Sequence, residues 1–86
     1  MRKIQYKEVS FISRIQYKRH KTRKMYFIEV DGIRNAYNIC NILNISLEEY
    51  IEILQSAGAR FSPSYGWVFY SEKSAMACIT MLNIIA

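Results

Sequence analysis

The fold of this chain is decided by residues 25–43, which read MYFIEVDGIRNAYNICNIL. Here Tyr26, Ile28 and Val30 recur with a period of two, opposite Met25, Phe27, Glu29 and Asp31. This aromatic and β-branched pattern is typical of a half-buried β-strand. Asp31 and Gly32 form a turn dipeptide. From Asn35 onward the apolar side chains recur at the spacing of a short helix. This stretch therefore predicts a chain that combines strands with helices.

A second alternating stretch, residues 11–17, precedes the first one. Between the two, residues 18–24 contain no apolar side chain, so we expect this segment to be exposed. It is short enough to form the tip of an antiparallel hairpin. The sequence thus predicts an N-terminal β-hairpin with a basic tip, and residues 4–9 either extend its first strand or form a separate strand.

Further elements are expected after residue 43. Ser46 is followed three residues later by a glutamate, which has the form of a capping box and predicts a helix over residues 46–57. Residues 59–70 have the pattern of a second, short hairpin. Residues 72–85 have the pattern of a C-terminal helix. The element order is therefore ββ–α–α–ββ–α, which defines an α+β fold.

Residues 39–54 resemble the helix-turn-helix signature of many DNA-binding proteins. That family has a small residue before the turn, an apolar residue on each side of it, and a turn residue that tolerates positive φ. The matching positions here are Cys40, Leu43, Ile45 and Asn44. The hairpin at 59–70 resembles the wing of the winged members. The resemblance implies a helix-turn-helix-like pair followed by a wing-like hairpin. The N-terminal antiparallel β-hairpin and the C-terminal apolar helix are predicted from the residue pattern.

Charge is distributed unevenly along the 86 residues, whose formal net charge is +5. Residues 1–24 hold nine basic side chains and one acid, a net +8, whereas residues 25–86 hold three bases and six acids, a net −3. Such a field steers an acidic partner to the basic end. Tyr17 and Tyr26 flank the basic tip and are expected to stack on unpaired bases. The side chains expected to contact nucleic acid are Arg14, Lys18, Arg19, Lys21, Arg23 and Lys24.

Two functions fit this pattern. The first is a small non-enzymatic nucleic-acid-binding protein that grips phosphate through the basic hairpin, with DNA favoured over RNA. The second is an inhibitor of the kind that phages and mobile elements encode, such as an anti-CRISPR protein, which binds a host protein or nucleoprotein. The second predicted helix is a poor reader of a DNA groove, because carboxylates approach phosphate unfavourably. Its exposed side chains are the partner-binding candidates of the second function: Glu48, Glu49, Glu52 and Gln55.

Catalytic and cofactor motifs are missing from the sequence. The chain has no glycine-rich phosphate loop, and its single histidine, His20, lies between cations and is a poor general base. Cys40 and Cys78 are far apart, with no histidine at metal-ligand spacing. The weakly polar run 75–86 is too short to cross a bilayer. We therefore expect no catalytic residue, metal or cofactor, and a cytoplasmic protein with no membrane partner.

The predicted C-terminal helix carries no charge after Lys73 and is apolar around much of its circumference. Such a helix is either central to the core, wedged between the two hairpins, or buried by another chain. If another chain buries it, we expect a homodimer through Cys78, Ile79, Leu82 and Ile85. The length fits one domain over residues 1–86, with the basic hairpin in 1–34 and the helical and wing-like half in 35–86.

Overall fold

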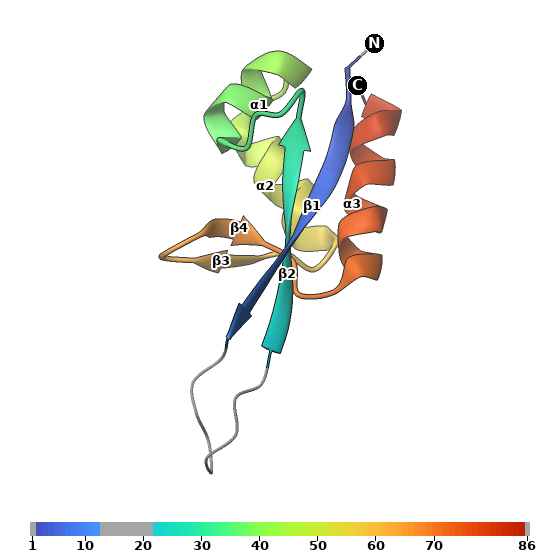
Figure 1. Ribbon diagram of the computed structural model, residues 1–86. Helices are drawn as coiled ribbons and strands as arrows, with labels where there is room; N and C mark the ends of the chain where they lie inside the picture. The colour runs from blue at the N-terminus through green and yellow to red at the C-terminus, as the bar shows by residue number, and fades with distance from the viewer. Residues whose placement is uncertain (1, 13–21, 86) are drawn as a thin grey trace.

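A computed structural model describes residues 2–12 and 22–85 (Figure 1). Within these ranges the chain forms two antiparallel β-hairpins and three α-helices in the predicted order, which confirms the α+β fold. The first hairpin comprises β1 (Ile4–Ile12) and β2 (Thr22–Val30), and the second comprises β3 (Arg60–Ser62) and β4 (Gly66–Val68). The helices are α1 (Ala36–Leu43), α2 (Leu47–Ser56) and α3 (Glu72–Ile85).

The long hairpin pairs residue for residue, from Ile4 opposite Val30 to Ile12 opposite Thr22. Residues 4–9 therefore extend the first strand rather than forming one of their own. The part of the first predicted strand at 13–17, and residues 18–21 of its tip, lie outside the described residues. We refer to the edge of the hairpin where Ile12 and Thr22 pair as its open end.

From Met25 onward, strand β2 buries side chains on both faces, so the prediction of a half-buried strand is wrong for this part. Tyr26, Ile28 and Val30 enter the main core with the three helices. On the other face Met25 and Phe27 form a second apolar cluster with Val68 of β4. The short β3–β4 hairpin covers that second face, and Figure 1 shows it extending sideways from the middle of the long hairpin. Two hydrogen bonds between Tyr26 and Phe69, of 2.8 and 2.9 Å, join the two hairpins.

The turn between α1 and α2 has the local chemistry that the sequence predicts. Asn44 ends α1 in the left-handed region, with φ 56° and ψ 46°, and its N–H donates to the carbonyl of Cys40. The Ser46 hydroxyl then accepts from the N–H of Glu49 at 3.1 Å and caps α2. Asparagine is the residue that best tolerates this backbone conformation after glycine. The close helix pair therefore depends on the side chains at only a few positions.

Helix α3 packs against both strands of the long hairpin and against α2. Its residues Ala75, Cys78 and Leu82 are fully buried in the chain's own core. Cys78 and Leu82 therefore cannot contact a second copy, and their prediction as dimer contacts is wrong. Ile79 is half-buried and Ile85 is exposed. The outward side of α3 instead presents a different apolar set: Met76, Met81, Ile84 and Ile85.

Candidate nucleic-acid interface

Two of the six predicted nucleic-acid contacts, Arg23 and Lys24, lie at the open end of the long hairpin. Arg23 and Lys24 are both exposed, and as successive residues of β2 they point to opposite faces of the ribbon. The other predicted phosphate contacts, Arg14, Lys18, Arg19 and Lys21, lie outside the described residues. They belong to the segment that joins β1 to β2, which holds these four cations and no carboxylate. The paired residues Ile12 and Thr22 are where this segment meets the two strands, and Arg23 is the next residue of β2.

One carboxylate lies close to this basic end. Glu8 of β1 accepts an ion-paired hydrogen bond from the Lys24 ammonium at 3.1 Å, and this bond raises the pKa of Lys24. Both side chains are about half exposed, so the pair is screened by water and contributes little to stability. The carboxylate comes from the neighbouring strand and not from α2. Among the described residues, the acidic side chains of α2 make no ion pair with Arg23 or Lys24.

A second cation, Arg34, stands where the two hairpins meet. Its guanidinium carbon lies 3.6 Å from the centroid of the Phe27 ring, and it donates to the carbonyl oxygen of Tyr65 at 2.9 Å. Lys7 is directly opposite Phe27 in the strand register, and it is exposed. Two positive side chains therefore flank Phe27 on the face that the β3–β4 hairpin covers. Arg34 was not among the predicted site residues, because a single arginine after a strand does not by itself indicate a binding site.

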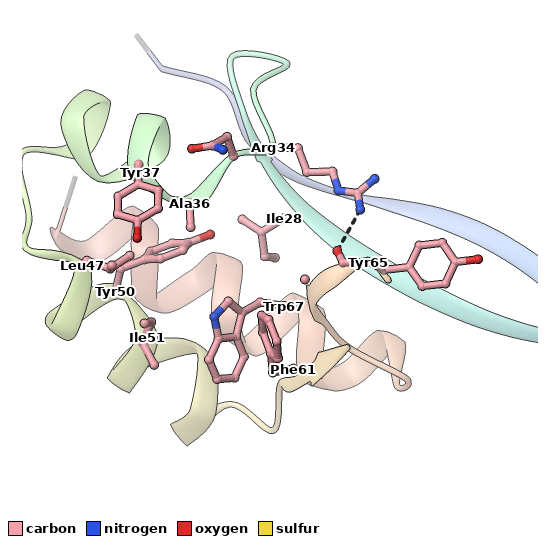
Figure 2. A pocket seen from close by; sticks show the side chains of 12 residues that line it. Ile28, Arg34, Ala36, Tyr37, Leu47, Tyr50, Ile51, Phe61, Tyr65 and Trp67 are labelled. Carbon is pink, nitrogen blue, oxygen red and sulfur yellow. Dashed lines mark hydrogen bonds between the residues drawn. The ribbon is translucent and has the colours of Figure 1, made fainter. Parts of the chain in front are cut away.

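A pocket of about 440 Å³ lies between the helix pair and the β3–β4 hairpin (Figure 2). This volume is within the range of small-molecule sites. Arg34 is the one charged side chain among its lining residues. The walls come from α1, α2, β2 and the second hairpin, and most are aromatic or aliphatic: Ile28, Ala36, Tyr37, Leu47, Tyr50, Ile51, Phe61, Tyr65 and Trp67.

Four aromatic side chains shape this aromatic pocket. Phe61 and Trp67 occupy paired positions on β3 and β4, and their rings meet edge to face with centroids 5.5 Å apart. Tyr37 of α1 and Tyr50 of α2 line the opposite wall (Figure 2). Tyr50 is buried, and this burial raises the pKa of its phenol. A phenol is a hydrogen-bond donor at neutral pH. The sequence did carry a signal here, since Phe61 and Trp67 flank one short predicted turn.

The acidic side chains of α2 do not line the aromatic pocket. Glu48, Glu49, Glu52 and Gln55 are all exposed, as predicted for partner-binding candidates. Three of them, Glu48, Glu52 and Gln55, line a shallow depression of about 500 Å³ with Leu47 and Ile51. Because those two apolar residues also line the aromatic pocket, the acidic depression adjoins it.

Tyr26 does not take part in any of these surfaces. It is 5% exposed, and its ring packs edge to face against Tyr6 with centroids 5.7 Å apart. The prediction that Tyr26 stacks on bases is therefore wrong, because the alternation of β2 directs this ring into the core. Tyr17, the other predicted stacking residue, lies outside the described residues.

The two cysteines are free and buried. Burial raises the pKa of Cys78 to about 12 and also raises the pKa of Cys40, so both thiols stay protonated at neutral pH. In the described parts of the chain no three His, Cys, Asp or Glu residues are grouped so that they could bind a metal ion. Nor does any described helix combine the length and the apolarity needed to span a bilayer. Comparison with protein-family models, curated proteins and solved structures finds no match to this chain.

Proposed function

We propose that this chain is a small non-enzymatic nucleic-acid-binding protein that grips phosphate through its long β-hairpin, with DNA as the favoured partner. The observation that carries the proposal is the position of Arg23 and Lys24, exposed at the open end of a two-stranded ribbon. A ribbon of this kind fits the major groove of duplex DNA. Lysine and arginine side chains on it displace condensed counterions, which favours binding without any base contact.

Glu8 pairs with Lys24 at that end, whereas the glutamates of α2 and the carboxylates of Glu29 and Asp31 lie elsewhere. Figure 1 shows α2, which carries three exposed glutamates, beside the opposite half of the hairpin. Within the hairpin, Glu29 accepts from the Gln5 amide at 3.2 Å, and Asp31 accepts from the backbone N–H of Lys3 at 2.8 Å. Both carboxylates thus lie near the end of β2 that leads into α1. This charge distribution favours the approach of a polyanion to the open end of the hairpin over its approach to the helix pair.

A salt titration tests the proposal. For duplex DNA, log affinity falls with log salt concentration at a slope of about −0.9 per phosphate contacted. We expect the triple variant Lys21→Gln, Arg23→Gln, Lys24→Gln to make this slope shallower by about two to three units. The matched control is Arg2→Gln, Lys3→Gln, Lys73→Gln, which removes the same three charges from exposed positions elsewhere.

The control variant distinguishes phosphate contacts made by the hairpin from a general effect of net charge. Both variants lower the formal net charge from +5 to +2, since each removes three cations. If the two variants weaken binding equally, the hairpin is not the contact surface. If the unaltered chain binds neither duplex nor single strands at about 50 mM salt, where polyanion contacts are strong, the proposal fails.

A second function is favoured by one observation, the acidic depression on α2. Its carboxylates surround an apolar floor made by Leu47 and Ile51, which suits a basic protein surface. In this alternative the chain is a phage- or mobile-element-type inhibitor that binds a host protein or nucleoprotein. The double variant Glu48→Lys, Glu52→Lys distinguishes the two: it abolishes an inhibitor's contact, whereas it leaves a hairpin-based DNA affinity equal or stronger.

A further inference from the structure

We propose that the aromatic pocket binds one unpaired base of a single-stranded nucleic acid, with the adjoining phosphate on the Arg34 side. This inference rests on the proposed function and adds a second, base-dependent contact to the phosphate grip of the hairpin. It is carried by the shape of the pocket walls, by the polar groups within them, and by the charge around the mouth.

The walls offer flat rings from two sides. Tyr37 on α1 and Phe61 on β3 lie on opposite sides of the pocket, and they are 67% and 63% exposed. Trp67 lies next to Phe61, so a planar group that enters contacts aromatic side chains on both sides. Exposed aromatic rings are the usual platform for unpaired bases, because every base has a π-face. A duplex base pair has no free face to offer, so the pocket selects single strands.

Polar groups within the walls suit the edge of a base. Tyr50 is 2% exposed, and its hydroxyl forms no hydrogen bond to another side chain or backbone group of the described residues. A phenol is protonated at neutral pH, so this hydroxyl presents a donor to whatever enters. The Trp67 indole N–H is a second donor, and the Asn35 amide, whose oxygen caps α1, keeps its N–H groups. A purely aliphatic occupant would leave these donors unpaired.

The charges around the pocket determine on which side the phosphate of the bound nucleotide lies. Arg34 lines the mouth and also lies over Phe27 of the long hairpin, so it connects the pocket to the proposed phosphate grip. The N-terminus of α1 opens on the same side, with no acidic residue in its first turn to offset its positive end. Glu48 and Glu52 line only the adjoining acidic depression, which shares Leu47 and Ile51 with the pocket. Phosphate is therefore attracted at Arg34 and repelled from the outer side of α2.

The test uses Trp67, the only tryptophan of the chain, as the reporter. The full-length protein is titrated with a 12-nucleotide single strand, with an abasic strand of the same length, and with a duplex. Binding is followed by anisotropy of an end label and, in parallel, by Trp67 fluorescence. We expect all three to bind, and only the strand that carries unpaired bases to quench Trp67.

Substitutions in the pocket then test whether the base-dependent part of the affinity comes from its aromatic side chains. Tyr37→Ala and Phe61→Ala should each weaken binding of the base-carrying strand roughly 5- to 100-fold and leave the abasic strand unaffected. The control is Tyr70→Ala, which removes an aromatic ring of 51% exposure that does not line the pocket. Because all three rings are largely exposed, the variants keep their fold, which circular dichroism verifies.

Two other outcomes overturn the inference. If the base-carrying and abasic strands bind equally and Trp67 is not quenched, the pocket takes no base, while the phosphate grip of the hairpin still stands. If no strand binds at low salt, the proposed function itself fails, and an apolar side chain of a protein partner becomes the occupant to test. The abasic strand therefore separates the two failures.

Discussion

Helix α3 offers a matched pair of substitutions that separates the core of the chain from its surface. Leu82 is fully buried among strands and helices, whereas Ile84, two residues later on the same helix, is 77% exposed. Replacing Leu82 with alanine removes its buried side-chain carbons and leaves a cavity that the surroundings only partly close. We expect Leu82→Ala to lower the free energy of unfolding by about 2–5 kcal/mol.

The same substitution at Ile84 should be nearly neutral. It removes little buried surface, and alanine has the higher helix propensity, so we expect a change within about 0.5 kcal/mol. Urea unfolding followed by circular dichroism measures both values, and thermal unfolding should show Leu82→Ala melting roughly 10–25 °C lower. If Ile84→Ala costs as much as Leu82→Ala, our assignment of the two faces of α3 is wrong.

The pair also decides which substitution can test for a homodimer. Because Leu82 belongs to the chain's own core, Leu82→Glu would unfold the protein and would say nothing about a second copy. Ile84→Glu is the better probe, since it places a charge on the outward apolar side of α3 without disturbing the core. If a homodimer forms through α3, the sedimentation mass of this variant falls to that of the monomer.

Three further predictions concern local chemistry. Asn44→Ala should cost about 1–2 kcal/mol because alanine is strained at φ 56°, whereas Asn44→Gly should keep the stability within a few tenths of a kcal/mol, as urea unfolding would show. Ser46→Ala should cost about 1 kcal/mol by removal of the α2 cap; Ser71→Ala should cost less, since its bond to the Ser74 N–H is 3.5 Å long, and equal losses would contradict the cap geometry. Cys78 keeps its proton in the folded state up to about pH 12, whereas an unfolded thiol loses it near pH 9, so stability should fall between these values by up to about 1.4 kcal/mol per pH unit. Cys78→Ala should make that slope shallower in urea unfolding at pH 8–10, and an unchanged slope would refute the assignment.

Much of the fold was predictable because its signals are local. The change of period after Val30, the Ser46 cap and the left-handed Asn44 each depend on side chains within a few residues of one another. The structure confirms the elements that these signals predict. Local patterns succeed here because backbone conformation responds first to nearest neighbours.

The candidate site was predictable only in part. The sequence indicated the basic segment and the acidic side of α2, because clustered charge is visible without a fold. For the aromatic pocket its one signal was the pair Phe61 and Trp67, because the other rings come from residues as far away as Tyr37. The sequence also predicted Tyr26 at the surface, whereas the structure buries this side chain.

The sequence by itself determined the order of strands and helices, their caps, and the unequal division of charge along the chain, because each of these depends on neighbouring residues. Only the tertiary structure decided which apolar faces are covered. The β3–β4 hairpin buries the second face of β2, and α3 turns Cys78 and Leu82 inward and Ile84 outward. A strand or helix with two apolar faces does not specify which face packs first. That choice is made by the partner elements, which compete to bury the most apolar area.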